Sequence, residues 1–230
     1  MMRFKIMMCL LQLLSRMTNG TRSAFELLTQ RHIGHTVYEY QMTTSSTTRA
    51  DTCAASCARH PRCSIFKFNP NTSLCTIFVP DTFLQVSSGN LGDAERHYAL
   101  TNGWCPVEYG YIFLKDVQMC IWLSSTQATQ DSAVSQCGLQ GGRLVVLADT
   151  HKWEAIQKLT INMGVYVYVG ADDKAVDGTF VWNNGRLVNA SMWHPHEPNG
   201  QLAENCVAVY RGLVDVPCFI KLTFICEILC

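Results

Sequence analysis

The segment "TQATQDSAVSQCGLQGGRLVVL", residues 126–147, indicates the fold more clearly than any other stretch of the chain. Polar residues that can cap a helix precede an amphipathic stretch, which places Ala133, Val134 and Cys137 on one face. The glycines of "GLQGG" end this helix, and "RLVVL" has the composition of a buried strand. We therefore predict a helix followed by a buried strand, with a cysteine on the inner face of the helix.

A second helix and a series of short strands follow. "DTHKWEAIQKLT", residues 149–160, predicts a helix capped by Asp149 or Thr150. The residues expected to face inward are Trp153, Ile156 and Leu159. Short strands are then predicted, in chain order, in "VYVYVGADD", "DGTFVWNNG", "ENCVAVY", "VDVPC" and "TFICE". Two helices followed by short strands predict an α+β fold, and cysteines in the first helix and the last strand can tie its ends together.

Length and charge limit the classes of function. The chain has 230 residues, enough for two ordinary domains or one large one. Lys+Arg and Asp+Glu both number 18, so the net charge is zero. A neutral chain lacks the electrostatic footprint expected for binding nucleic acid or an anionic membrane. A neutral ligand such as a sugar stays compatible with this composition.

The N-terminus predicts export. "MMRFKIMMCLLQLL" combines a basic start with an apolar run that is too short to span a bilayer, so we predict a signal peptide over residues 1–22. No other segment is long and apolar enough for an anchor, and the protein is expected to be secreted and extracellular. Twelve cysteines agree with an oxidising compartment. Without Cys9, which falls in the signal, eleven remain, and an odd number leaves one thiol without an internal partner.

The first group of cysteines lies within residues 53–75. "TTRADTCAASCARHPRC" predicts a short helix capped by Thr47 or Thr48 and ended by Pro61, and "CSIFKFNP" and "CTIFV" predict two strands joined by a turn. A helix joined to a hairpin by two nested disulfides is the structure we favour. The pairs would be Cys53–Cys75 and Cys57–Cys63, although spacing alone leaves other connectivities open. Metal binding by the four cysteines is the competing interpretation, which export and the lack of a second CxxC disfavour.

This first region, residues 23–100, resembles the PAN/apple domain family. The cysteine pattern C-x3-C-x5-C-x11-C together with "FKFNP" carries the resemblance, which implies a small helix-on-hairpin domain. Many apple domains add an outer disulfide that ties their termini, and this sequence has no cysteines for it.

The second region, residues 104–228, resembles a C-type lectin-like domain. The landmarks, in order, are "CP" at 105, the first helix with Cys137, "GGRLVVL", "YVGADD", "GTFVWNNG", Trp193, "EPN", "ENC", "PC" at 217 and "FICE". The resemblance implies two helices, short antiparallel strands and long loops. It also implies the disulfides Cys105–Cys120, Cys137–Cys226 and Cys206–Cys218. Cys230 would then stay unpaired, which suggests a disulfide-linked dimer.

Oxygen-bearing side chains gather in "WHPHEPNGQLAENC", residues 193–206. Calcium takes six to eight oxygen ligands, and Glu197, Asn199, Glu204 and Asp215 supply that chemistry. A cis bond before Pro198 could turn both neighbouring side chains to one side. The resemblance implies that these four residues hold Ca²⁺, that the ion takes two vicinal sugar hydroxyls, and that the same side chains hydrogen-bond the hydroxyls. The order Glu-Pro-Asn resembles members that prefer mannose, glucose or N-acetylglucosamine over galactose.

The calcium motif is incomplete. The family has Trp-Asn-Asp where this chain has Leu213-Val214-Asp215, so Val214 removes one calcium ligand and one hydroxyl partner. Some members hold a second ion, and Asp173, Asp177 and Glu204 match three of its usual acids, whereas Gly200 stands in the place of a fourth.

Two functions remain open. The first is a secreted calcium-dependent lectin for terminal mannose-, glucose- or GlcNAc-type sugars or glycoproteins, compatible with innate-immune recognition. The alternative is a calcium-independent protein-interaction module with a degenerate sugar site. An enzyme is not expected, because no nucleophile pattern is present and a lectin-like fold offers little cleft for a glycosidase built on Glu197 and Glu204. Zinc binding by His194 and His196 lacks a third ligand.

Three asparagines begin N-x-S/T sequons. Asn71 and Asn189 lie in predicted turns, where glycosylation is expected in a secreted protein, and Asn19 would be lost if it falls within the signal. The tryptophans Trp153, Trp182 and Trp193 are predicted to be core residues rather than platforms for sugar stacking.

Overall fold

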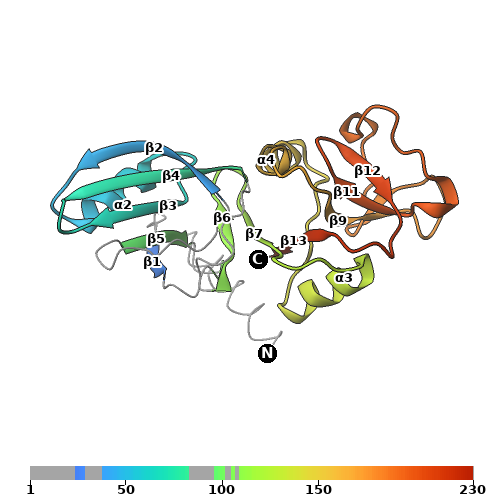
Figure 1. Ribbon diagram of the computed structural model, residues 1–230, viewed down its shortest axis with the longest axis horizontal. Helices are drawn as coiled ribbons and strands as arrows, with labels where there is room; N and C mark the ends of the chain where they lie inside the picture. The colour runs from blue at the N-terminus through green and yellow to red at the C-terminus, as the bar shows by residue number, and fades with distance from the viewer. Residues whose placement is uncertain (1–23, 29–37, 83–95, 102–104, 107–108, 230) are drawn as a thin grey trace, which may run out of the picture. The chain divides into compact units, whose positions relative to one another are not determined.

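The computed structural model describes residues 24–28, 38–82, 96–101, 105–106 and 109–229 (Figure 1). The predicted signal peptide, Asn19 and Cys230 lie outside these residues. The chain divides into two compact units. The described residues up to Cys120 belong to the first unit, apart from Thr82, and those from Ile121 to Ile228 belong to the second.

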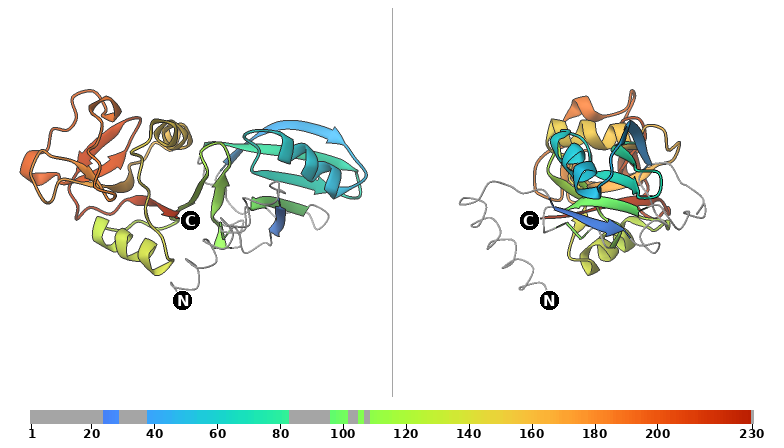
Figure 2. Two further views of the ribbon diagram at one scale, coloured as in Figure 1. Left: turned by 180° about the vertical axis from the view of Figure 1, so that it is seen from behind. Right: turned by 90° about the vertical axis from the view of Figure 1, so that its left-hand side faces the viewer.

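The first unit contains a five-stranded sheet in the order β1-β5-β3-β4-β2. Its strands are β1 (Ala24–Leu28), β2 (Tyr38–Ser46), β3 (Ile65–Asn69), β4 (Leu74–Thr82) and β5 (Arg96–Thr101). The predicted hairpin is the pair β3–β4 at the centre of this sheet, and helix α2 (Ala50–Arg59) packs against β3 (Figure 2). Strands β1, β2 and β5 were not predicted from the sequence.

The core of this unit lies between α2 and the hairpin. Disulfides join Cys53 to Cys75 and Cys57 to Cys63, the same two pairs that the sequence favoured. Phe66 on β3 is buried and stacks on Tyr98 of β5 with ring centroids 4.7 Å apart. Small hydrophobic cores of this kind are commonly stabilised by disulfides, which reduce the conformational entropy of the unfolded chain.

The expected start of α2 was wrong. Arg49, rather than Thr47 or Thr48, is the N-cap residue, and it makes no side-chain capping hydrogen bond. The Thr47 hydroxyl instead accepts a long hydrogen bond from the Arg49 backbone amide at 3.4 Å. His60 is the C-cap, so the helix ends directly before Pro61, as the missing amide hydrogen of proline requires.

The second sheet has eight strands, with the path β12-β11-β9-β13-β7-β6, β10 paired to β9 and β8 paired to β13. The strands are β6 (Ile112–Leu114), β7 (Met119–Leu123), β8 (Arg143–Leu144), β9 (Val167–Asp172), β10 (Val181–Trp182), β11 (Cys206–Val209), β12 (Leu213–Val216) and β13 (Thr223–Ile228). Most pairs are antiparallel, but β9 and β13 run parallel, a pairing that the expectation of antiparallel strands did not include.

Two helices accompany this sheet, α3 (Gln130–Leu139) and α4 (Thr150–Thr160). Asp149 caps α4 as predicted, because its carboxylate accepts the amides of the two residues that follow Thr150 at 3.0 and 3.1 Å. Val134 is 40% exposed, so its predicted inward position on α3 was wrong. The buried face of α3 is narrower than predicted and consists of Gln130, Ala133 and Cys137.

Disulfides fasten the elements of this region. Cys137 on α3 is bonded to Cys226 on β13, and Cys206 on β11 is bonded to Cys218 beyond β12. A third bond joins Cys105 to Cys120. These are the three pairs that the lectin resemblance implied. No helix within the described ranges is long and apolar enough to cross a membrane.

Candidate cation and carbohydrate site

The loop between β10 and β11 is fastened beside β12. Trp193 forms a parallel bridge with Leu213, and the His194 amide donates to the Leu213 carbonyl at 2.8 Å. Gly212 permits this close approach, because a Cβ atom there would lie 2.7 Å from the His194 nitrogen. The segment that follows His194 therefore begins at a fixed position on the edge of the sheet.

Asp215 on β12 organises the next part of the loop. The Glu197–Pro198 peptide bond is cis. Beyond it, the Asn199 amide donates to both carboxylate oxygens of Asp215 at 3.0 and 3.1 Å, and the Gly200 amide donates to one of them at 2.8 Å. Asp215 is only 4% exposed, so these amides are its main compensation for burial. This carboxylate joins the Glu-Pro-Asn segment to the strand.

Three of the four predicted ligands form one acidic group, Glu197, Glu204 and Asp215. The pKa of Glu197 is raised to about 7, mainly by burial and also by a hydrogen bond with Asp215 and the negative charges of Asp215 and Glu204. Burial and the charge of Asp215 also raise the pKa of Glu204. One carboxylate oxygen of Glu197 is buried without a hydrogen-bond partner. Like charges held together in this way favour a cation between them.

Gly200 makes room for this group. A Cβ atom at position 200 would lie 2.2 Å from the Cβ, Cγ and Oε2 atoms of Glu204. No real side chain tolerates that distance, so glycine is required for Glu204 to lie where it does. The residue that replaces a family acid is thus also the residue that lets Glu204 approach Asp215.

A second group surrounds Asp173, at the end of β9. Asp173 is 2% exposed, and one of its carboxylate oxygens accepts the Gly178 amide at 2.7 Å while the other is buried without a partner. Burial raises the pKa of Asp173, and the charges of Asp177 and Asp172 add to this. Asn205 has an equally unpartnered buried side-chain oxygen, and its main-chain carbonyl accepts the Asp173 amide at 3.2 Å.

Asn205 is a candidate ligand that sequence reasoning missed. It directly follows Glu204 in "ENC", and that position was the only available signal. Glu204, which was expected to serve both groups, is placed with Asp215. The charges that shift the pKa of Asp173 come from Asp177 and Asp172 instead.

Val214 is a core residue. It is 4% exposed, pairs with Ala208 on β11 and belongs to a buried cluster that includes Tyr168 and Val216. Side chains alternate along a strand, so Val214 and Val216 face this core while Asp215 binds the loop. The position where the family has an asparagine therefore contributes packing here and offers no oxygen.

The two groups have the ligand chemistry that calcium prefers. Among the described residues, no three carboxylate, imidazole or thiol side chains are arranged to enclose a metal ion. Calcium also accepts amide oxygens, which Asn199 and Asn205 carry. The unpartnered buried oxygens of Glu197, Asp173 and Asn205 are acceptors without a donor, as expected of groups that meet a cation.

The predicted core tryptophans occupy buried or partly buried positions. Trp153 and Trp182 are buried. Trp193 is partly buried and packs edge-to-face on Phe180 with ring centroids 4.8 Å apart.

Comparison with known proteins agrees with this architecture. The Lectin C-type domain family matches residues 126–228, and the PAN domain family matches residues 27–96. Human C-type lectin domain family 11 member A is 27% identical over 175 residues, covering 63% of this chain and 54% of that protein. The chain spans about a third to about half of the length of the curated relatives it matches.

Two solved structures are also similar to this chain. The carbohydrate-recognition domain of cow CD23, solved in the presence of a GlcNAc2Man3 oligosaccharide, is 24% identical, with 52% of this chain and 93% of that chain covered and a TM-score of 0.46. A calcium-independent type II antifreeze protein is 25% identical, with 48% and 85% covered and a TM-score of 0.43.

The protein is a disulfide-rich α+β protein with a lectin-like module. More specifically, the chain carries a PAN domain followed by a C-type lectin domain. The lectin domain assignment supports the expectation of a binding protein rather than an enzyme.

Proposed function

We propose that the lectin domain binds calcium through Glu197, Asn199, Glu204 and Asp215 and recognises a sugar through that ion. The observation that carries the proposal is the group of three carboxylates in which one oxygen of Glu197 is buried without a donor. Such a group is unfavourable on its own and becomes favourable when a divalent cation neutralises it.

The chain's own residues would read the sugar by geometry. Bound calcium supplies open coordination positions for two vicinal hydroxyls. The carboxylates of Glu197 and Glu204 accept hydrogen bonds from those hydroxyls, and the side-chain amide of Asn199 donates hydrogen bonds to the hydroxyl oxygens. Asp215 holds the backbone of Asn199 and Gly200, so it fixes the loop as well as offering ligand oxygens. The Glu-Pro-Asn order supports terminal mannose, glucose or N-acetylglucosamine.

We also propose a second cation at Asp173, Asp177 and Asn205. The support is the pair of buried oxygens, one on Asp173 and one on Asn205, that have no donor and that a backbone hydrogen bond keeps close together. An ion there would hold Asn205, the residue that directly follows Glu204.

Retention on mannose resin tests the proposal. The full chain is expected to bind in calcium and to elute with chelator or free mannose, and to pass through a galactose resin. An Asp215→Asn variant should lose retention, because the charge that anchors the loop is gone. Glu154→Gln, an exposed acid on α4, is the matched control. Equal retention with and without chelator would count against calcium-dependent binding.

A calcium-independent interaction module is the second candidate, and the core position of Val214 favours it. Here the acidic groups would be remnants, and both domains would contact protein surfaces. Calcium titration calorimetry discriminates between the candidates, since this one predicts no heat and no rise in melting temperature.

Secretion, glycosylation and dimerisation are further proposals. Asn71 is exposed in the turn between β3 and β4, and Asn189 is exposed while its side-chain oxygen accepts from the Ser191 amide and hydroxyl at 3.0 Å. A glycan would occupy the amide nitrogen and leave that oxygen free to accept. The signal peptide predicted over residues 1–22 supports the proposal of export. Non-reducing electrophoresis tests the dimer proposed through Cys230, because a monomer band alone rejects it.

A further inference from the structure

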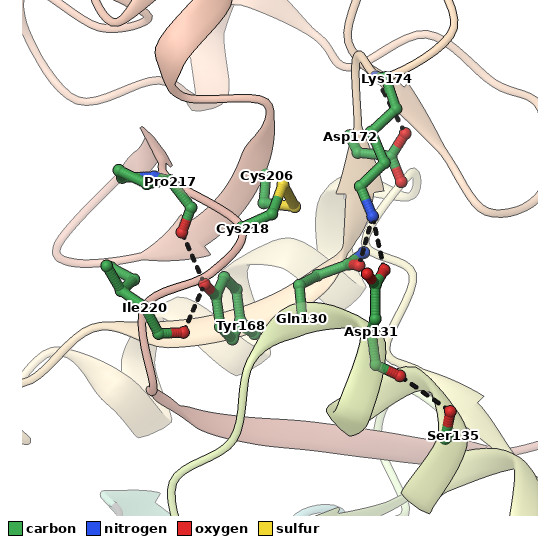
Figure 3. Close-up of polar contacts among 10 residues, drawn as sticks. All are labelled: Gln130, Asp131, Ser135, Tyr168, Asp172, Lys174, Cys206, Pro217, Cys218 and Ile220. Atoms are coloured by element: carbon green, nitrogen blue, oxygen red, sulfur yellow. Dashed lines mark hydrogen bonds and ion pairs between the residues drawn. A yellow bond between two sulfur atoms is a disulfide. The ribbon is translucent and has the colours of Figure 1, made fainter.

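A lysine next to the second acidic group is fastened to a distant helix. The Lys174 ammonium donates to the Gln130 side-chain oxygen at 2.8 Å and to the Asp131 carboxylate at 2.8 Å (Figure 3). Both partners belong to the first turn of α3 and are more than 40 residues away in sequence. Nothing in the proposed ligand sets explains why a cation is held here.

Lys174 lies in the loop that shapes Asp173. The Lys174 amide donates to the Asp172 side chain at 3.3 Å, the Val176 amide donates to the Asp173 carbonyl at 3.1 Å, and the Gly178 amide donates to the Asp173 carboxylate at 2.7 Å. Gly178 has a positive φ of 74°, which a side chain would strain. Lys174 is thus the chain neighbour of Asp173 within a short loop whose amides hold Asp172 and Asp173.

The helical end of the contact is buried and held by a backbone hydrogen bond. Gln130 is 2% exposed, and its backbone amide donates to the Cys218 carbonyl at 3.1 Å, next to the Cys206–Cys218 disulfide. Tyr168 on β9 holds the segment around Cys218, because its hydroxyl lies 3.0 Å from the Pro217 carbonyl and 3.1 Å from the Ile220 carbonyl (Figure 3).

Gln130 is the more important of the two partners. The Asp131 side chain is largely exposed, and an ion pair of that kind contributes little by itself. The Gln130 oxygen is held in a buried residue, so it fixes the direction of the Lys174 side chain, and a hydrogen bond to a charged donor is stronger than a neutral one.

We propose that Lys174 is a positioning residue, which ties the loop of Asp173 to α3 and thereby sets the affinity of the second cation without contacting it. This inference rests on the proposed function, since it concerns the cation at Asp173, Asp177 and Asn205. Pairing with Asp131 also neutralises a positive charge that would otherwise oppose a nearby cation.

Two variants separate positioning from electrostatics. Lys174→Met removes the contact and the charge together, and electrostatics alone would then tighten the second cation. Gln130→Met removes only the acceptor and leaves every charge in place. Positioning predicts that both variants weaken the second cation, by several-fold and less than the roughly 10- to 100-fold seen when a group holding a ligand directly is lost. Lys174→Arg should restore most of the affinity.

Calcium titration calorimetry on the full chain measures both affinities. Asp177→Asn and Glu197→Gln assign the second and first ions, and Lys221→Met, an exposed lysine, is the matched control. Hydrogen exchange in chelator adds a readout without calcium, and the Gly178 amide should exchange faster in Lys174→Met. Unchanged or tighter binding of the second ion in both variants overturns the inference. A wild-type chain that takes up only the first ion also overturns it and leaves the sugar site standing, whereas no calcium uptake at all rejects the proposed function itself.

Discussion

Replacing Glu197 with glutamine should change the stability of the lectin domain in opposite directions with and without calcium. In chelator, the carboxylate of Glu197 is held beside Asp215 and Glu204, and its pKa is raised from 4.5 to about 7. An acid with a raised pKa contributes full stability below pH 4.5 and loses it as the pH rises through 7. At pH 8 the ionised side chain therefore opposes folding, and Glu197→Gln removes that charge and lets an amide donate to Asp215.

The size of the effect follows from the two pKa values. Their difference corresponds to about 3 kcal/mol at a pH well above both. Glu197 is only partly buried, so solvent screening reduces this to about 1–2 kcal/mol. For a domain of this size, that is a rise in melting temperature of about 4–8 °C in chelator.

Thermal unfolding of the wild type and Glu197→Gln, each at pH 5 and pH 8 and each in chelator and in calcium, is the assay. In chelator the wild type should melt lower at pH 8 than at pH 5, and the variant should lose much of that difference. In calcium the wild type should melt higher than the variant, which is the reverse of their order in chelator at pH 8. The reason is that a ligand present at 100 times its Kd stabilises the wild type by about 2.7 kcal/mol, whereas the variant lacks a ligand group. Glu154→Gln should show neither change. A variant that melts lower by the same amount in every condition refutes the reasoning.

Three further substitutions test individual features. Gly200→Ala should lower the free energy of unfolding by about 1–3 kcal/mol and weaken calcium binding, because Glu204 must move. Gly138→Ala on α3, where a Cβ meets nothing within 4 Å, should be neutral or slightly stabilising in the same melting assay. Equal effects of the two substitutions would contradict the close packing of Gly200 against Glu204. Tyr168→Phe should cost about 1 kcal/mol in denaturant unfolding, since its hydroxyl meets the Pro217 and Ile220 carbonyls, and an unchanged midpoint would count against those contacts. Val214→Asn should lower the free energy of unfolding by about 1–3 kcal/mol in chelator, because it buries an amide. Calcium should nevertheless raise the melting temperature of this variant more than that of the wild type. An equal rise would show that the amide does not reach the ion.

Local patterns predicted the framework of the fold well. Asp149 at the start of α4 and Pro61 after α2 lie where capping and chain-breaking chemistry place them. The cysteine pairs of the PAN domain were favoured from a helix with two cysteines four residues apart beside a hairpin, although spacing alone left other connectivities open. The remaining pairs came from the lectin resemblance, since the sequence separation of Cys137 and Cys226 carries no geometric information.

Tertiary context decided what local patterns could not. Val134 has the right spacing for the inner face of α3, but the packed face is narrow and leaves it exposed. The parallel pairing of β9 with β13 joins segments that are more than 50 residues apart, which no local signal reveals.

The site shows the same division. Residue types in "EPN" and "ENC" identified candidate ligands, but the grouping of Glu204 with Asp215 depends on the space that Gly200 leaves. The closeness of Asn205 to Asp173 depends on a backbone hydrogen bond between two segments far apart in the sequence. Sequence alone shows neither of these contacts.

A crystal structure grown with calcium chloride and α-methyl mannoside tests the central claim most directly. The account predicts an ion about 2.3–2.6 Å from oxygens of Glu197, Asn199, Glu204 and Asp215, with two vicinal hydroxyls of the sugar completing its coordination. A loop that holds only water under these conditions, with the three carboxylates in the same arrangement, would contradict it.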